Sequence, residues 1–256
     1  MAEAGKIFHQ IKRKTGAAIG DFGLIENGDR ILVAVSGGKD SYTLLHVLEE
    51  LRRRAPVRFE LIAGNLDPGF PGYRSDRIEE YLQRQGFNYH LEKTESYRII
   101  EEKRRPGTSY CAFCARLRRG HLYSLADRLQ CNKLALGHHL DDAVETLLLN
   151  QFFSGRLAAM SAKLLADNGR HTVIRPLIYV AERDIRSLSE LWQFPLVDCS
   201  CPLAGTTDRN RQRMKQLLNQ LEPEIPAIRR SLLGALKQVE PRHLLDSQVS
   251  KSFKSN

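Results

Sequence analysis

The sequence predicts an α/β protein with a doubly wound parallel sheet, an N-terminal helix before it and a helical C-terminal extension after it. Three observations lead to this fold class. Short apolar runs rich in β-branched residues recur along the chain, segments of helical periodicity follow them, and polar glycine-containing loops join the two. Strands buried on both faces of a parallel sheet form continuous apolar runs, and strand–helix alternation is typical of such sheets.

The elements follow in order along the chain. The first 20 residues predict a basic amphipathic helix with Ile7, Ile11 and Ala18 on one side. We expect strands at 30–36, 59–67, 87–93, 132–137 and 194–198, with a further apolar segment at 171–177. We expect helices at 41–54, 75–85, 115–130, 140–153 and 182–192, and a mainly helical chain after Cys201.

This order predicts four parts of the chain. Residues 1–25 form the basic helix, and 26–204 form the central domain, into which a cysteine-containing region is inserted. Residues 205–245 form a helical C-terminal part. The last part, 246–256, is expected to be a disordered tail, as chain ends often are.

Composition and charge narrow the class of protein. Hydrophobic residues make up 42% and charged residues 27% of the 256, which is ordinary for a globular protein. The polar start MAEAGKIFHQIKRK does not resemble a signal peptide, and no apolar run approaches the roughly 18 residues of a membrane span. We therefore expect a cytoplasmic protein without membrane contact.

A net charge of +9 raises the prospect of a polyanionic partner. The positive charge is clustered rather than uniform, which favours a nucleic acid over a merely basic surface. One cluster lies between residues 101 and 130, and the other lies on an expected helix. Their basic residues are Lys103, Arg104, Arg105, Arg116, Arg118, Arg119 and Arg128, followed by Arg209, Arg211, Arg213 and Lys215.

The segment SGGKDS, at residues 36–41, predicts a nucleotide-binding loop where a strand passes into a helix. Its two glycines let the backbone approach a phosphate, and the helix N-terminus favours an anion. The segment departs from the Walker pattern, because Val33 stands where that pattern has glycine and Asp40 follows Lys39 where it has Ser or Thr. Ser36 and Ser41 add hydroxyl groups.

Three loops should meet at the same edge of the predicted sheet, because ligands gather beyond the carboxyl ends of parallel strands. These loops cover residues 36–41, 65–68 and 137–142. The third carries Asp141 and Asp142 at a helix start. Their carboxylates suit Mg²⁺ coordination or proton transfer, with Asp142 the stronger catalytic candidate. The alternative is that they cap the helix and complement its dipole.

Five cysteines, four of them in two tight clusters, indicate metal binding or catalysis rather than a disulfide framework. Cys111 and Cys114 form a C-x-x-C, a spacing that lets two thiolates reach one metal. Cys201 supplies a third ligand, which would suit an iron–sulfur cluster with one open position. Cys199 as a fourth ligand would allow a closed zinc site. Cys131 begins an apolar strand and is expected to be a buried small hydrophobe.

The loop SGGKDS after an apolar strand resembles the PP-loop of the ATP pyrophosphatases, which adenylate a substrate and release pyrophosphate. With CAFCARLRRGHLY, LALGHHLDDAVETLLLN, IRPLIY and AIGDFGLIENGDRILVAVSGGKDSYTLL, the chain resembles the tRNA 2-thiocytidine synthetase family from Ile7 to about Leu245. The resemblance implies an adenine nucleotide alpha-hydrolase-like PP-loop fold. It also implies an ATP-dependent replacement of oxygen by sulfur at C2 of a tRNA cytidine, at anticodon-loop position 32, with Mg²⁺ and a [4Fe–4S] cluster.

The resemblance also assigns roles to residues. Those implied to bind ATP are Ala34, Val35, Ser36, Gly37, Gly38, Lys39, Asp40, Ser41, Leu66 and Gly137. Those implied to hold the cluster are Cys111, Cys114 and Cys201, with Cys199 as the alternative third ligand. Those implied to act in catalysis are Asp142, Arg118 and Lys39.

The implied partners are the anticodon loop of tRNA, a cysteine desulfurase as sulfur donor, and a second copy of the chain in a homodimer. Two other functions compete with this one. The first is a PP-loop enzyme without a cluster that joins an amine to tRNA, as lysidine synthetases do. The second is a non-catalytic RNA-binding protein stabilised by zinc, which would not consume ATP.

Overall fold

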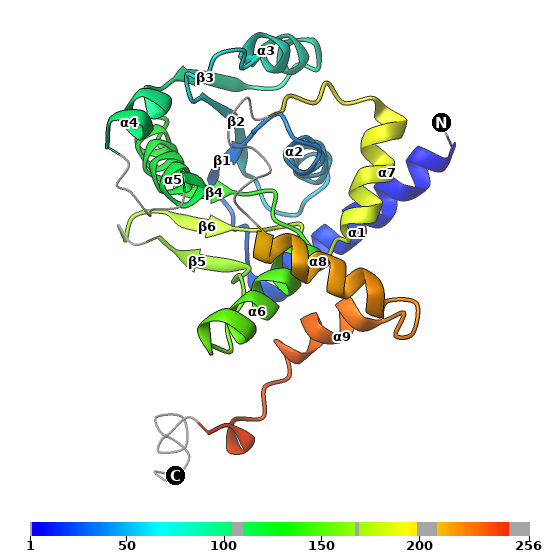
Figure 1. Cartoon of the computed structure of the whole chain (residues 1–256). Coiled ribbons are helices and arrows are strands. Elements are labelled where there is room, and N and C mark those ends of the chain that lie inside the picture. Colours follow the sequence, from blue (N-terminus) through cyan, green and yellow to red (C-terminus); the bar gives the residue numbers. More distant parts are fainter. Residues whose placement is uncertain (1, 104–109, 167–168, 199–208, 246–256) are drawn as a thin grey trace. The chain divides into compact units, whose positions relative to one another are not determined.

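The structure of the chain, a computed structural model, describes residues 2–103, 110–166, 169–198 and 209–245 (Figure 1). The chain divides into two compact units, one made of residues 1–142 and 160–209 and the other of 143–159 and 210–256. Within the described ranges, no helix combines the length and the apolar character needed to cross a membrane.

A six-stranded sheet forms the centre of the first unit (Figure 1). Its order is β3-β2-β1-β4-β6-β5, and all neighbouring pairs are parallel except β5 with β6. The predicted doubly wound, mainly parallel fold is confirmed. The strands are β1 (Arg30–Ala34), β2 (Glu60–Asp67), β3 (Tyr89–Lys93), β4 (Lys133–Ala135), β5 (Lys163–Leu165) and β6 (Thr172–Ile174).

The central strands are apolar because both of their faces are covered. Leu32 on β1 and Leu134 on β4 are fully or almost fully buried, and they share a core cluster with Leu125 from a helix. Gly64 on β2 makes this packing possible, because a Cβ there would come within 2.7 Å of the Leu32 side chain. Cys131 is also buried in this cluster, as expected, and burial raises the pKa of its thiol.

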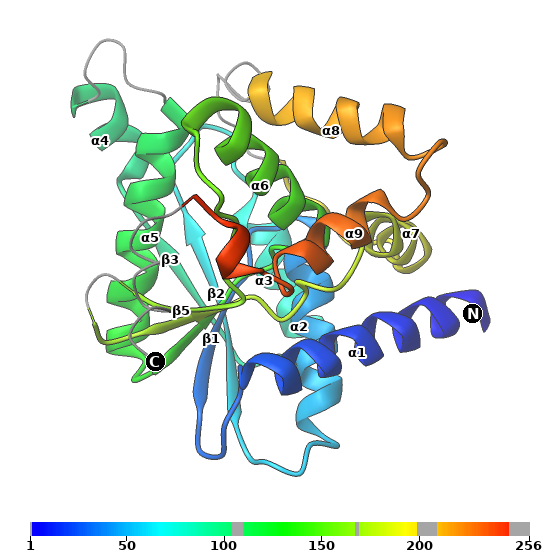
Figure 2. The ribbon, with the colours of Figure 1, turned by 90° about the horizontal axis from the view of Figure 1, so that it is seen from below.

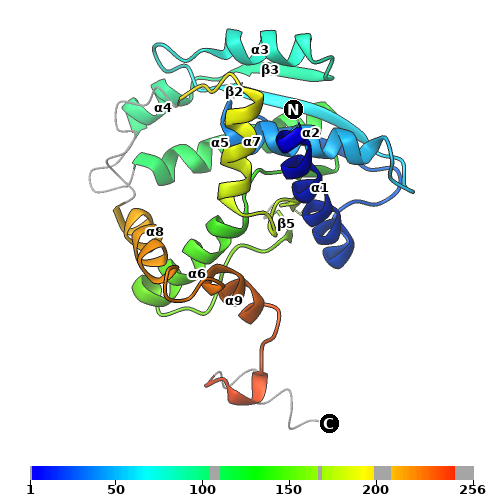
Figure 3. The ribbon, with the colours of Figure 1, turned by 90° about the vertical axis from the view of Figure 1, so that its right-hand side faces the viewer.

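Helices cover both faces of the sheet (Figure 2). On one face α2 packs on β1 and β2, and α3 packs on β2 and β3; on the other face α5 packs on β2 and β4. Helices α1 and α7 run side by side and both contact α2 (Figure 3). The bounds are α1 (Ala2–Phe22), α2 (Lys39–Arg52), α3 (Ser75–Arg84), α4 (Ser96–Lys103), α5 (Tyr110–Arg128) and α7 (Glu182–Trp192).

The strand order reverses between β1 and β4. From β1 the chain builds outward through β2 to β3, and it then returns through α5 to place β4 on the other side of β1. At such a reversal the carboxyl ends of the two adjacent strands are neighbours, and ligands bind in the crevice just beyond them. The topology therefore positions the loop at 35–38 beside the loop at 136–139.

Four details differ from the expectation. Residues 194–198 were expected to form a strand but join no sheet, because Pro195 lacks a backbone donor and Val197 N–H donates instead to the Gly37 carbonyl at 3.0 Å. The short edge strand β5 and the helix α4 were missed. Helix α5 begins at Tyr110, five residues before the predicted start at 115, so the C-x-x-C lies on a helix.

The second unit is helical. It contains most of α6 (Leu140–Ser154), with α8 (Arg209–Leu221), α9 (Ile228–Ala235) and the 3₁₀ turn η1 (Pro241–His243). Arg229 links α8 to α9, because its guanidinium donates to Asn219 at 2.7 Å and pairs with Glu222. The expected tail at 246–256 lies outside the described residues, and the four predicted part boundaries stay predictions.

Candidate active site

The loop between β1 and α2 is held in shape by its own serines. The Ser36 N–H donates to Ser41 Oγ at 3.2 Å, and that hydroxyl in turn donates to the Gly38 carbonyl at 2.8 Å. Ser41 is buried, so its hydroxyl braces the loop, whereas Ser36 lines a pocket. Gly38 is the N-cap of α2, which places the helix N-terminus and its unpaired N–H groups at this loop.

Gly37 is required by both its backbone and its surroundings. Its φ of +82° lies in the region that favours glycine, and a Cβ would come within 2.8 Å of Val197 Cβ and 3.0 Å of Ile78 Cδ1. The segment 194–198 thus closes over the loop, and it is also fastened by the Tyr42 hydroxyl, which donates to the Pro195 carbonyl at 3.4 Å.

The loop after β4 approaches the start of α2 just as closely. A Cβ on Gly137 would lie 3.1–3.2 Å from backbone atoms of Asp40 and Ser41. These backbone atoms cannot move aside as a flexible side chain could. Gly137 therefore keeps the two loops in contact, which agrees with its predicted place beside the nucleotide loop.

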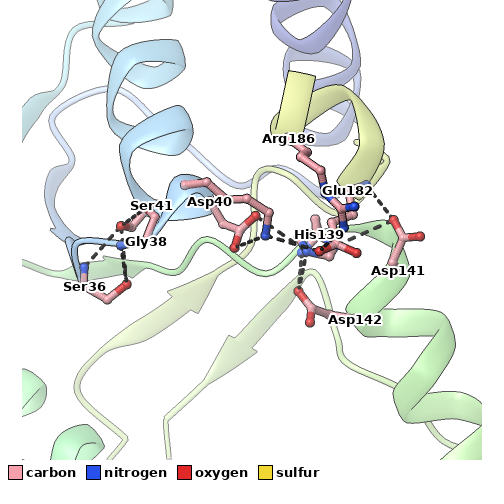
Figure 4. A network of polar contacts seen from close by, with 10 residues as sticks. Ser36, Gly38, Asp40, Ser41, His139, Asp141, Asp142, Glu182 and Arg186 are labelled. Atoms are coloured by element: carbon pink, nitrogen blue, oxygen red, sulfur yellow. Dashed lines mark hydrogen bonds and ion pairs between the residues drawn. The ribbon is translucent and has the colours of Figure 1, made fainter. Parts of the chain in front are cut away.

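Figure 4 shows the polar network that this approach creates. Lys39 Nζ lies 3.1 Å from Asp40 Oδ2 and 3.3 Å from Glu182 Oε1. Burial opposes the charge of Lys39, but the carboxylates of Asp40 and Glu182 outweigh it and raise the pKa of Lys39. The ammonium group is therefore fully charged at neutral pH.

The two aspartates of the GHHLDD loop have different contacts. Asp142 Oδ2 accepts from the His139 N–H at 3.0 Å, so this carboxylate reaches back to the residue before α6, as in a capping box. Asp141 Oδ2 accepts from the Glu182 N–H at 2.7 Å, which is a capping contact at the start of α7. The contact of Asp142 is of the capping kind expected at this helix start, whereas the contact of Asp141 with α7 was not expected.

His139 connects the network on both sides. Its side chain is buried, and Nε2 lies 3.4 Å from Asp142 Oδ2 and 3.7 Å from Asp40 Oδ1. Asp40 Oδ1 is buried and has no hydrogen-bond partner among the described residues. One carboxylate from each loop therefore lies beside the same ring nitrogen of His139.

A cavity of about 200 Å³ opens beside this network. The nucleotide loop contributes Ser36 and Gly38, the end of β2 contributes Leu66, and α5 contributes Cys114 and Arg118. The cavity thus brings together residues predicted to bind ATP, to hold the cluster and to act in catalysis. Gly38 and Cys114 are more than 70 positions apart in sequence. Its other walls are Pro68, Phe70, Tyr73, Thr94, Ser96 and Val197.

Cys114 and Arg118 share one face of α5, because four residues make about one helical turn. Cys114 is half-buried and packs against a cluster formed by Phe70 and Ile100, so its thiol has apolar neighbours. Arg118 is exposed at the cavity wall. A thiol and a guanidinium therefore face the same space as the nucleotide loop.

Part of the predicted cluster site cannot be placed. The backbone of Cys111 lies in the first turn of α5, three residues before Cys114, but its side chain is outside the described part of the structure. Cys199 and Cys201 lie wholly outside the described residues. Among the described residues, no three His, Cys, Asp or Glu side chains form a group that could hold a metal.

Two further nucleotide-site predictions fall at the end of β1, where Ala34 and the following residue, Val35, are buried. Sequence reasoning missed a residue that fixes this strand end. Asn65 is fully buried, and its amide donates to the Val35 carbonyl at 2.8 Å and to the Tyr73 hydroxyl at 3.0 Å. A single asparagine inside the apolar strand FELIAGNLD was the available signal.

Glu182 and Arg175 were also missed. Glu182 begins α7 and pairs with Lys39 from 143 positions away, which no local pattern reveals. Arg175 follows β6, and its Nε donates to His138 Nδ1 at 3.3 Å. Burial lowers the pKa of Arg175. Arg175 lies in IRPLIY, which the sequence singled out without giving it a role.

Comparison with known proteins gives concordant matches. The sequence profile of the PP-loop domain family matches residues 7–221. A protein of Syntrophotalea carbinolica named tRNA-cytidine(32) 2-sulfurtransferase is 64% identical over 244 residues, which cover 95% of this chain and 94% of that protein. A protein of the same name from Geobacter sulfurreducens is 63% identical over 244 residues, which cover 95% of each chain.

Among solved structures, the chain is similar in fold to the U34-tRNA thiolase NcsA from Methanococcus maripaludis, determined with its [4Fe–4S] cluster. The TM-score is 0.71 at 22% sequence identity, and the match covers 93% of this chain and 81% of the thiolase. At this identity the likeness concerns the arrangement of helices and strands.

Proposed function

This chain belongs to the PP-loop family and, within it, to the tRNA-cytidine(32) 2-sulfurtransferases, and we propose that it catalyses the reaction in that name. The substrate is a tRNA whose cytidine 32 exchanges its C2 oxygen for sulfur, with ATP converted to AMP and pyrophosphate. The observation that carries this proposal is the cavity in which Ser36 and Gly38 of the nucleotide loop meet Cys114 and Arg118.

ATP is held at the cavity by the nucleotide loop. Residues 36–41 cradle the phosphates with backbone N–H groups at the start of α2, and Lys39 contributes a charge-assisted hydrogen bond. Ala34, Val35 and Leu66 border the adenosine from the ends of β1 and β2. Gly137 allows the close approach of the second loop.

Mg²⁺ accompanies the nucleotide in this proposal. Its support is the pair of carboxylates, Asp40 and Asp142, that face His139 from the two loops, and the buried Asp40 Oδ1, which accepts no hydrogen bond within the described ranges. Oxygen ligands of this kind are those that Mg²⁺ takes, and it usually binds one or two carboxylates together with phosphates. The ion would neutralise charge on the leaving pyrophosphate.

The residues near the cavity also fit a [4Fe–4S] cluster. Cluster irons take cysteine thiolates, and Cys114 presents a half-buried thiol with apolar neighbours at the cavity wall. We assign the ligands to Cys111, Cys114 and Cys201, with Cys199 as the alternative third ligand. When bound, the cluster would supply an iron with an open coordination position for sulfur.

The protein side chains then act on the cytidine in two steps. The C2 oxygen attacks the α-phosphorus of ATP, and the pyrophosphate that leaves is held by Lys39 and the N–H groups of the nucleotide loop. Sulfide adds to C2, and the oxygen departs with AMP. The guanidinium of Arg118 stabilises negative charge that develops in both steps, and Asp142 accepts or donates the proton at the base.

Basic side chains bind the phosphate backbone of the RNA. Arg116 and Arg119 are exposed on α5, and Arg209 and Arg213 are exposed on α8. Contacts of this kind are made to phosphates, so binding weakens steeply with salt. The target base leaves the anticodon-loop stack to reach the cavity.

We further propose a cysteine desulfurase as the source of sulfur and a homodimer as the assembly.

Nucleoside mass spectrometry of tRNA tests this function. A strain without the gene should lack 2-thiocytidine, and a plasmid copy should restore it. Lys39→Ala and Cys114→Ala copies should fail, whereas Cys131→Ala, a cysteine buried in the core, should succeed. Unchanged 2-thiocytidine in the deletion strain would refute the proposal. Full activity of Cys114→Ala would refute the cluster assignment and favour a cluster-free tRNA ligase.

A further inference from the structure

Glu182, the first residue of α7, occupies a position at the nucleotide loop that the proposed reaction does not explain. Its Oε1 lies 3.3 Å from Lys39 Nζ and 3.4 Å from Arg186 Nη2. The second partner of the lysine is Asp40, whose Oδ2 lies 3.1 Å from Lys39 Nζ. The PP-loop lysine is therefore shared between one carboxylate of its own loop and one from a distant helix.

These contacts are shielded from water. The side chains of Lys39 and Glu182 are 23% and 13% exposed, and the pKa of Lys39 is raised despite the opposing effect of burial. An ion pair in such surroundings is screened less than one at the open surface. A phosphate that binds Lys39 must therefore compete with the ion pair between Lys39 and Glu182.

The position of Glu182 is also fixed from the other loop. Its backbone N–H donates to Asp141 Oδ2 at 2.7 Å, and the Leu140 N–H donates to the Val180 carbonyl at 3.0 Å. The GHHLDD loop thus holds the start of α7, and α7 holds the lysine of the nucleotide loop. Glu182 is the residue through which these elements reach Lys39.

We propose that Glu182 is a positioning residue that holds the Lys39 ammonium at the nucleotide loop and competes with the phosphates of ATP for it. The carboxylate engages the ammonium group that the polyphosphate needs, so it lowers the affinity for ATP and eases the release of pyrophosphate. This proposal rests on the proposed binding of ATP at residues 36–41.

Equilibrium titration of the full-length protein tests it, with ATP, pyrophosphate and adenosine as probes. Glu182→Gln keeps the size of the side chain and removes its charge, so ATP and pyrophosphate should bind about three- to tenfold more tightly. Adenosine, which has no phosphate, should bind as it does to the wild type. In steady state, KM for ATP should fall while kcat falls or stays constant, because product release is slowed.

Matched variants separate this role from general effects. Glu190→Gln removes the same charge from an exposed position on α7 and should change nothing. In a Lys39→Gln background, Glu182→Gln should give no gain. Arg186→Gln should weaken ATP binding about twofold, because it leaves Glu182 more available to Lys39; this variant also serves if Glu182→Gln does not fold.

The outcomes are distinguishable. Weaker or unchanged binding of ATP by folded Glu182→Gln would overturn the proposal, as would an equal gain in Glu190→Gln or a gain that survives Lys39→Gln. For Arg186→Gln, tighter or unchanged binding would overturn it. A wild-type protein that does not bind ATP at all would instead refute the proposed function.

Discussion

Replacing Gly37 by alanine tests the closure of the nucleotide loop by the segment 194–198. Two costs add at this position. Alanine at a φ of +82° loses about 1–2 kcal/mol relative to an ordinary conformation. The new Cβ would lie 2.8 Å from Val197 Cβ and 3.0 Å from Ile78 Cδ1, and overpacking of this kind costs about 1–3 kcal/mol. The expected loss of unfolding free energy is therefore about 2–5 kcal/mol.

The adjacent glycine provides the control. Gly38 has a φ of −87°, and among the described residues a Cβ would meet Ser36 Oγ at 3.4 Å, an ordinary contact. Gly38→Ala should therefore cost at most about 1 kcal/mol, the usual effect at a helix N-cap.

Urea unfolding and thermal denaturation of both variants give the comparison. Each kcal/mol lowers Tm by roughly 2–4 °C in a protein of this size. ATP binding should be lost in Gly37→Ala at temperatures where the protein is still folded, because the loop and segment 194–198 are pushed apart. Equal stability of the two variants would show that Val197 does not lie against Gly37 as described.

Two further predictions concern the core. Lys133→Met should lower the unfolding free energy by about 3–5 kcal/mol, because it leaves the buried Asp29 without the ammonium group 2.7 Å away. Lys163→Met, which removes the lysine of an exposed ion pair, should have little effect in the same urea titration. Similar losses of unfolding free energy in both variants would contradict the reasoning. Stability should also decline as the pH falls from 7 to 4, by up to about 3 kcal/mol from His46. Burial lowers the pKa of His46 to about 4, so between the ordinary pKa of 6.5 and this value the unfolded chain takes up a proton that the folded chain excludes. His46→Leu should make the unfolding free energy less dependent on pH between 7 and 4. An unaltered pH dependence in this variant would refute the role of His46.

The sequence was sufficient for the central strands of the sheet and for the loops at its carboxyl edge. Continuous apolar runs such as RILVAVS marked the buried strands, and the topological rule for parallel sheets placed residues 36–41 and 137–142 together. The edge strand β5 was not predictable in this way, because its three residues are exposed and carry little periodicity. Residues 194–198 have the composition of a strand, but their place is decided by Gly37, far away in the chain.

Local motifs singled out Lys39, Asp40 and Cys114 as site residues, because each motif is complete within a few residues, and the family resemblance singled out Arg118. The structure places Cys114 and Arg118 at one cavity with the nucleotide loop. Glu182 joins the site only through tertiary structure, and an acidic residue at a helix start has an ordinary explanation as a complement to the helix dipole. The residues that hold motif residues in place leave no local pattern.

The contact between Gly37 and Val197 also sets an order of events during synthesis. About 160 residues separate the two partners, and ribosomes add roughly 5–20 residues per second, so the loop waits on the order of 10–30 s for its cover. Until then, the Gly37 carbonyl has no partner from this segment, and the loop lacks the wall that Val197 provides. The nucleotide site is consequently completed near the end of translation, and a chain released before residue 197 would carry the full SGGKDS sequence without a closed site.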